Sequence, residues 1–278
     1  MKKIIFAGGD ERMLFAAAEF AAGGFEAAAF GFDIYAGAYG KIEKAGEAEL
    51  ARADFAVLPP VVSRDGENLF APFSEKPIAL SGLDFGGARV FHGTACPRTF
   101  AGSTDYCSRE AFAVRNAVPT AQGAVKIAME ETKQTVFGMR AAVLGGGRIA
   151  RVLAGTLTAL GAKTAVFARK SDARAWAAAQ GAEAYDFREL CGRLGGFDCI
   201  FNTVPQKILG GRELASIKKG TPIIELASPP GCVGAVEAKG AGIRLVPAAG
   251  LPGRITPKTA GKIIYETITE IMAEEENR

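Results

Sequence analysis

Twice in this sequence a short apolar strand runs into a glycine turn and then into a helix, an arrangement that leaves few fold classes open. The first copy is IIFAGGDER (4–12) and the second is AAVLGGGRIA (141–150). Around both copies, apolar strand-like segments alternate with helix-like segments, as in parallel sheets that helices cover on both faces. The sequence therefore predicts an α/β protein of two domains, each a mostly parallel sheet with flanking helices.

A chain of 278 residues is long for one domain and comfortable for two. The predicted parts are an N-terminal substrate and catalytic domain (1–115), a linking helix (116–135), a Rossmann domain (136–255) and a C-terminal helix (256–278) that packs back on the first domain. Pro119 suits the first turn of the linking helix, and Thr256 and Pro257 suit the start of the last helix. Strands are expected at 3–8, 25–33, 54–59, 76–82, 88–93, 139–144, 163–169, at the start of 198–205 and at the start of 223–234.

Composition excludes several classes of function. The 33 basic residues are dispersed among 30 acidic ones, so a nucleic-acid surface is not expected. The five cysteines form no C-x-x-C pair, which is typical of a reducing compartment and predicts no metal site. The apolar run at the N-terminus is too short for a secretory signal, and no run reaches membrane-spanning length. A cytoplasmic protein is expected.

The second glycine turn has the parts of a dinucleotide site. Gly145, Gly147 and Ala150 fit G-x-G-x-x-A between a predicted strand and a predicted helix. The first glycine makes the tight turn, the second lets the backbone approach a diphosphate, and the small third residue allows close packing of helix and strand. The free amides and the dipole of the helix N-terminus favour the anion. A generic strand–turn–helix is the alternative interpretation.

The end of the next strand predicts which dinucleotide is bound. Arg169, Lys170 and Ser171 stand where an NAD-specific site would have Asp or Glu. Arg and Ser favour a 2′-phosphate, so NADP(H) is predicted in preference to NAD(H). A solvated basic strand end is the alternative. The other predicted cofactor-binding residues follow the first glycine or end later strands: Gly146, Arg148, Ile149, Asn202, Thr203, Val204, Pro205, Ala227 and Ser228.

The first glycine turn lacks a small residue at the packing position and carries Asp10 where a diphosphate would lie. A carboxylate beside a phosphate is unfavourable, and Arg12 offsets it only in part. This turn is predicted not to bind a nucleotide. It is either one wall of a substrate site or a plain tight turn with a surface Asp and Arg.

Several motifs together resemble the A subunits of dipicolinate synthase, over nearly the whole chain. They are GGDER (8–12), GFD (31–33), NAVPTAQGAV (116–125), AAVLGGGRIA (141–150), FARKS (167–171), FNTVP (201–205), LASPPG (226–231) and GLPGRITPKTAGKII (250–264). The resemblance implies an NADP-type dehydrogenase that oxidises a dihydrodipicolinate, formed from 4-hydroxy-tetrahydrodipicolinate on a branch of the lysine pathway, to pyridine-2,6-dicarboxylate. It further implies sporulation, the mother-cell cytoplasm and, as partner, a flavoprotein-like B subunit. A homo-oligomer is also expected.

Such a substrate is a dianion, so its site needs cations, hydroxyls or amides for two carboxylates. The predicted substrate-binding residues are Arg12, Ser63, Asn116, Thr120, Thr256, Lys258 and Thr259, in a cleft between the domains. Asp10, Arg12 and Lys258 are the predicted catalytic residues, with Asp10 as candidate base. His92, the one histidine, is the only possible imidazole base. The alternatives are another two-domain NAD(P)-dependent dehydrogenase of a small amino or hydroxy acid, and a cofactor-binding subunit without catalysis.

Overall fold

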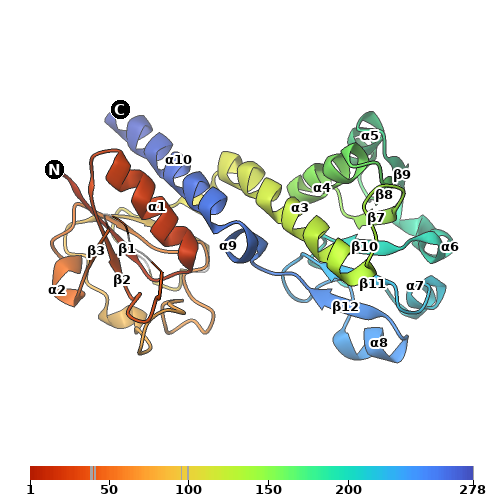
Figure 1. Ribbon diagram of the computed structural model, residues 1–278, viewed down its shortest axis with the longest axis horizontal. Helices are drawn as coiled ribbons and strands as arrows, with labels where there is room; N and C mark the ends of the chain where they lie inside the picture. Colours follow the sequence, from red (N-terminus) through yellow and green to blue (C-terminus); the bar gives the residue numbers. More distant parts are fainter. Residues whose placement is uncertain (38–39, 41, 95, 99, 278) are drawn as a thin grey trace. The chain divides into compact units, whose positions relative to one another are not determined.

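The computed structural model describes residues 1–37, 40, 42–94, 96–98 and 100–277. The chain forms two compact units, one of residues 1–116 and 252–278 and the other of residues 117–251 (Figure 1). Each unit holds a six-stranded sheet, and every strand pair within both sheets is parallel. The predicted fold class is confirmed. Within the described residues, no helix is long and apolar enough to cross a membrane.

The sheet of the first unit has the order β3-β2-β1-β4-β5-β6. Its strands are β1 (Lys3–Ala7), β2 (Glu26–Phe30), β3 (Glu43–Lys44), β4 (Phe55–Val57), β5 (Arg89–His92) and β6 (Thr104–Asp105). Its helices are α1 (Glu11–Ala22), α2 (Glu47–Leu50), the start of α3 (Glu110–Thr132), α9 (Leu251–Ile255) and α10 (Pro257–Glu276). The last helix begins at Pro257, as the sequence predicts.

Both faces of this first sheet are buried. Side chains alternate along a strand, and those of Ile4 and Phe6 enter one apolar cluster while Ile5 and Ala7 enter another. Helices α1 and α10 close the first cluster, and α2 with irregular chain between β4 and β5 closes the second. Burial on both faces explains why β1 is an almost unbroken apolar run.

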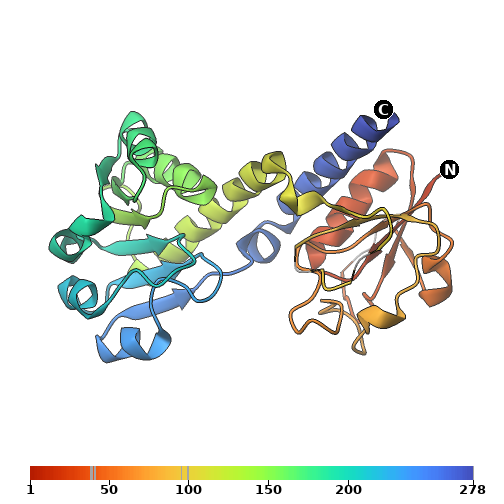
Figure 2. The same cartoon turned by 180° about the vertical axis from the view of Figure 1, so that it is seen from behind.

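Helix α10 lies along α1 in both views (Figures 1 and 2). Its isoleucines Ile263, Ile264, Ile268 and Ile271 are buried in the first cluster. The two helices approach closely at Gly261, where an added Cβ would lie 2.6 Å from the Arg12 carbonyl oxygen and 2.6 Å from the Phe15 Cβ. A glycine is therefore required at this contact.

The second unit has the sheet order β12-β11-β10-β7-β8-β9. Its strands are β7 (Arg140–Leu144), β8 (Lys163–Phe167), β9 (Glu183–Tyr185), β10 (Cys199–Asn202), β11 (Pro222–Glu225) and β12 (Arg244–Pro247). Its other helices are α4 (Arg148–Ala159), α5 (Ser171–Ala179), α6 (Leu190–Arg193), α7 (Gly211–Ser216) and α8 (Ala235–Gly240). The two sheets have the same topology. In each, the first three strands of the unit follow one another from the centre of the sheet to one edge, and the last three follow one another from the centre to the opposite edge.

Two local predictions are wrong. The segment 76–82 is not a strand: it makes one isolated bridge, between Ala79 and Asn68, and ends in a 3₁₀ helix, because Leu80 fills the core from irregular chain. Pro119 lies inside α3 and not in its first turn. The helix begins earlier because Phe112 packs against Tyr106 in the core of the first unit, with ring centroids 5.5 Å apart.

Replacing Gly261 by Ala tests the close contact of α1 and α10. We expect the free energy of unfolding to fall by about 1–3 kcal/mol, because the added methyl group would overlap the Arg12 carbonyl oxygen and the Phe15 side chain. The control is Gly155→Ala in α4, where the added Cβ would lie 3.5 Å from the flexible Gln180 side chain. That variant should gain about 0.5–1 kcal/mol, as alanine does in helix interiors. Urea unfolding followed by circular dichroism measures both. Equal stabilisation of the two variants would contradict the packing.

Candidate functional site

In the second unit, the strand order reverses between β7 and β10, and the glycine turn that follows β7 lies at this reversal. Ligands of open parallel sheets bind at such points, beyond the carboxyl ends of the strands. Gly145 has a φ of +122°, and an added Cβ would collide with Thr203 Oγ1. Thr203 in turn donates its hydroxyl to the Leu144 carbonyl oxygen at 2.8 Å. The first glycine is therefore required for the turn to pass this strand end.

The space in front of the turn is open. Gly147 is the N-cap of α4, no side chain caps the helix there, and an added Cβ at Gly147 would meet nothing within 4 Å. A cavity of about 330 Å³ adjoins the turn. It is lined by Gly145, Gly146, Gly147, Ala168, Arg169, Lys170, Ala173, Phe187, Val204, Gln206 and Ile208. The N-terminus of a twelve-residue helix without a side-chain cap fits the diphosphate of a dinucleotide.

The cavity includes six of the predicted cofactor-binding residues and adds five that the sequence reasoning missed. Ala168, Ala173, Phe187, Gln206 and Ile208 are the additions. Phe187 follows β9, a three-residue strand with a weak signal in the sequence. The remaining predicted residues, among them Arg148, Ile149, Ser171, Pro205, Ala227 and Ser228, lie in the same turn or at the same edge of the sheet, outside the lining of this cavity.

The wall of the cavity beyond β8 is basic. Arg169 and Lys170 are exposed there, and Arg174 fixes their loop by donating Nη1 to the carbonyl oxygens of Ala168 and Arg169, both at 2.8 Å. The nearby acid is Asp186, which precedes Phe187. Hydrogen bonds from Arg188, with the charge of Arg174, hold the pKa of Asp186 at about 2.

A buried hydrogen-bond network ties the ends of β10 and β11 together. The fully buried Asn202 donates Nδ2 to Glu225 Oε1 at 2.6 Å and to the Val204 carbonyl oxygen at 2.9 Å. Glu225 Oε1 also accepts from the Ala227 N–H at 3.1 Å, and Oε2 accepts from the Cys232 N–H at 2.9 Å. Asn202, predicted as a cofactor contact, is thus bonded within the protein. Glu225 was missed, although an acid that ends an apolar strand is a usable signal.

The glycine turn of the first unit is filled by the chain itself. The Gly9 N–H donates to the Phe70 carbonyl oxygen at 2.6 Å. An added Cβ at Gly8 would lie 2.7 Å from Leu69 Cδ2. This turn also lies where its sheet reverses order, between β1 and β4, but residues 69 and 70 occupy the space in front of it.

Asp10 and Arg12 bind each other. Arg12 donates Nε to Asp10 Oδ1 at 2.7 Å and Nη2 to Oδ2 at 2.8 Å, and Asp10 is the N-cap of α1, accepting from the Arg12 N–H. Only 8% of Arg12 is exposed. The α9 backbone covers this pair, because an added Cβ at Gly253 would collide with both side chains. The structure therefore brings the GLPG motif onto the predicted catalytic pair.

The other predicted site residues have different surroundings. Ser63 is buried. Its hydroxyl donates to Asp65 Oδ1 and accepts from the Gly66 N–H. Lys258 and Thr259 are exposed in the first turn of α10. Thr256 occupies the N-cap position, but its hydroxyl faces back to the Pro252 carbonyl oxygen at 3.4 Å and does not cap the helix.

Three more candidates complete the set. His92 ends β5 and has Nδ1 2.8 Å from the Gly93 carbonyl oxygen, so Nδ1 donates this hydrogen bond and Nε2 takes no part in it. Thr120 is buried and Asn116 is half-buried, one turn apart on α3. In the first unit, Asp10, Ser63 and His92 all follow or end parallel strands and so belong to one edge of the sheet.

Comparison with known proteins agrees with the geometry. Residues 107–229 match the family described as D-isomer specific 2-hydroxyacid dehydrogenase, NAD binding domain. The dipicolinate synthase A protein of Bacillus subtilis is 37% identical over 166 residues, which are 60% of this chain and 56% of that protein. The chain is similar to the A subunits of dipicolinate synthase. The predicted resemblance is confirmed.

Solved structures extend the likeness over the whole chain. The A subunit of dipicolinate synthase from Bacillus halodurans has a TM-score of 0.85 at 28% identity, covering 98% of each chain. Its counterpart from Bacillus subtilis has a TM-score of 0.83 at 29% identity, covering 99% of this chain and 97% of that one. Together with the matched domain, these findings assign an NAD(P)-dependent oxidoreductase fold and a nicotinamide dinucleotide as the cofactor.

Exchanging Glu225 for Gln tests the network behind the cavity at the glycine turn of the second unit. Gln has one oxygen for three donors, so we expect a loss of about 1–3 kcal/mol in the free energy of unfolding. The dissociation constant of the nicotinamide dinucleotide should also rise several-fold, because Asn202 joins Glu225 to Val204 and Val204 lines the cavity. The control is Glu213→Gln, since among the described residues the Glu213 carboxylate accepts from the Gly210 N–H alone and Gln keeps that bond. Thermal unfolding and NADPH fluorescence titration measure both. Unchanged values in Glu225→Gln would contradict this role.

Proposed function

We propose that this chain is the dehydrogenase subunit of a dipicolinate synthase and oxidises a dihydrodipicolinate to pyridine-2,6-dicarboxylate. The observation that carries the proposal is the likeness to two A subunits of dipicolinate synthase over at least 97% of every chain compared. The open glycine turn of the second unit supplies the cofactor site that an oxidoreductase needs.

We propose NADP(H) as the cofactor. A 2′-phosphate at the end of β8 would meet the exposed Arg169 and Lys170, and no carboxylate ends this strand. Asp186, which precedes the lining residue Phe187, pairs with both Arg174 and Arg188. A basic wall of this kind attracts a phosphate and gives a ribose 2′-hydroxyl no acceptor.

The reaction removes one hydride and one proton from the ring and makes it aromatic. When bound at the glycine turn of the second unit, NADP⁺ would supply the acceptor for the hydride. The residues of the first unit would bind the two carboxylates. Arg12 is our main candidate, because Asp10 uses its Nε and one N–H of Nη2 and holds the guanidinium in a fixed orientation.

Both oxygens of Asp10 accept from Arg12, so the pairing favours an orienting role for Asp10 over that of a base. His92 Nε2 is the alternative proton acceptor at the same edge of the sheet. Lys258, with Thr256 and Thr259, could receive the second carboxylate at the start of α10, where the helix dipole also favours an anion. Ser63, Asn116 and Thr120 stay proposed substrate contacts.

The partner and the setting are also part of the proposal. The B subunit of dipicolinate synthase, a flavoprotein-like chain, is the proposed partner, and self-association is proposed beside it. The proposed location is the cytoplasm of the mother cell during sporulation. The match to a 2-hydroxyacid dehydrogenase domain favours, as second candidate, the oxidation of a small hydroxy or amino acid.

Reversing the charge of Arg169 tests the cofactor assignment. In Arg169→Asp, the dissociation constant of NADPH should rise at least about tenfold, because an attractive charge pair becomes repulsive. NADH binding should change little. The control is Lys163→Asp, the same change of charge at the other end of β8. Fluorescence titration measures both cofactors. Equal losses for NADPH and NADH in Arg169→Asp would contradict a 2′-phosphate site there.

The activity is tested with purified chain, NADP⁺ and freshly generated dihydrodipicolinate, alone and with the B subunit, by NADPH absorbance. We expect NADPH formation in at least one of these mixtures. Arg12→Ala should raise KM or lower kcat with NADPH affinity unchanged, and His92→Gln should abolish turnover if His92 is the base. Oxidation of 2-hydroxy or amino acids instead would favour the second candidate. Cofactor binding without any turnover would favour a non-catalytic subunit.

A further inference from the structure

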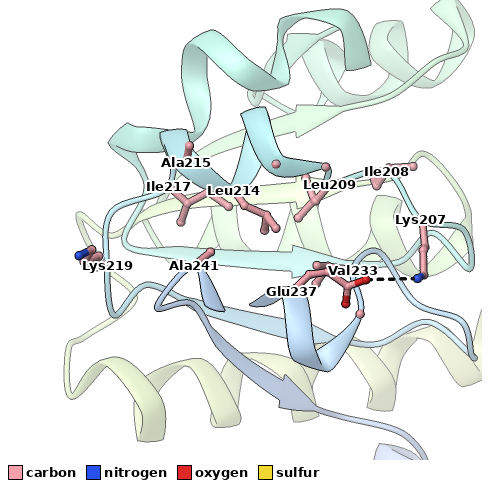
Figure 3. Close-up of a pocket in the computed structure, with 13 residues that line it drawn as sticks. Lys207, Ile208, Leu209, Leu214, Ala215, Ile217, Lys219, Val233, Glu237 and Ala241 are labelled. Carbon is pink, nitrogen blue, oxygen red and sulfur yellow. Dashed lines mark ion pairs between the residues drawn. The ribbon is translucent and has the colours of Figure 1, made fainter. Parts of the chain in front are cut away.

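A second cavity, of about 680 Å³, lies in the second unit between α7 and α8 (Figure 3). Leu209, Leu214 and Ile217 line one side of it, and Val233 and Ala241 line the other (Figure 3). Leu209, Leu214, Ile217 and Val233 are each only 4–5% exposed. We call it the α7–α8 groove. A concave apolar site of this volume is in the usual range for small-molecule ligands.

The groove is separate from the cavity at the glycine turn of residues 145–147, the proposed cofactor cavity, but the two share a wall. The segment 204–209 separates the two spaces, because Val204 and Gln206 line the cavity at the glycine turn whereas Lys207 and Leu209 line the groove. Ile208 lines both. The Ile208 and Leu209 N–H groups donate to the Cys232 carbonyl oxygen at 3.0 and 3.1 Å, which holds the segment in place. A ligand in the groove therefore leaves room for the dinucleotide.

The charges on the groove wall define the ligand further. Lys207 and Glu237 pair across one end, with Nζ 3.8 Å from Oε1, and Lys219 lies at the opposite end (Figure 3). Among the residues that the structure describes, no carboxylate pairs with Lys219. The groove thus carries one net positive charge beside an apolar floor.

We propose that the α7–α8 groove binds a small molecule with an apolar body and a single carboxylate. The apolar body would lie on the floor made by Leu209, Leu214 and Val233. The carboxylate would pair with Lys219 at the mouth of the groove, since the Lys219 stem lies beside Gly242 and its nitrogen points outward, away from the other labelled lining residues (Figure 3). A monoanion balances the charge of the wall, whereas a phosphate dianion would be left with one lysine for two charges.

Octanoate is the probe, and 1-octanol is its uncharged match of the same length. Isothermal titration calorimetry on the full chain should give one site per chain, with a dissociation constant of about 0.1–1 mM for octanoate. Octanol should bind several-fold more weakly. Saturation with NADPH should change octanoate affinity less than twofold. Displacement by NADPH would mean that octanoate occupies the cofactor cavity, and it would overturn the proposal.

Two pairs of variants locate the site. Lys219→Glu should weaken octanoate at least tenfold and octanol hardly at all, whereas the neighbouring Lys218→Glu, outside the groove lining, should change either by less than twofold. Ala241→Phe should fill the groove and abolish binding of both probes, whereas Ala235→Phe, exposed on α8 outside the lining, should not. Equal losses in both lysine variants, equal affinity for octanol and octanoate, or no binding to the unaltered chain would each overturn the proposal.

Discussion

Parallel strands place all their carboxyl ends at one edge of a sheet, and the polar backbone groups at that edge need partners. Both units of this chain have the same strand order, so both meet this requirement at the same point, where the order reverses. In the first unit the chain supplies the partners, since Phe70 accepts from Gly9 and Asp10 caps α1. In the second unit the turn is open and α4 has no side-chain cap. One topology thus gives a closed turn and an open one.

The closed glycine turn of the first unit fixes the position of the Arg12 guanidinium. Because Asp10 caps α1 and holds Arg12, the first unit has a fixed guanidinium at the place where the second has a helix N-terminus without a side-chain cap. Both arrangements suit anions, but a buried, oriented guanidinium suits a carboxylate and helix amides suit a diphosphate. The α9 backbone packs on this pair at Gly253, which gives the GLPG motif a structural reason for its second glycine.

The sequence predicted the fold class, the open turn and the basic strand end because each depends on residues close together in the chain. Glycine spacing and the absence of an acid after β8 needed no knowledge of distant contacts. The short edge strands β3, β6, β9 and β12 were not predicted, since two to four residues carry little periodicity. The segment 76–82 looked like a strand because Ile78 and Leu80 are apolar, but tertiary burial from irregular chain gives the same signal.

In the candidate site, too, the features that depend on residues close together in the chain could be predicted, and those that depend on distant contacts could not. The Asp10–Arg12 pair is local, and yet its meaning depended on Gly253, more than 200 positions away, which no spacing rule connects to it. The role of Glu225 depended on a donor at the end of another strand, Asn202 in β10, and on two backbone donors from the chain that follows its own strand. The α7–α8 groove shows the limit most clearly. Its floor residues have the composition of any apolar core, so only their arrangement in space distinguishes a ligand site from ordinary packing.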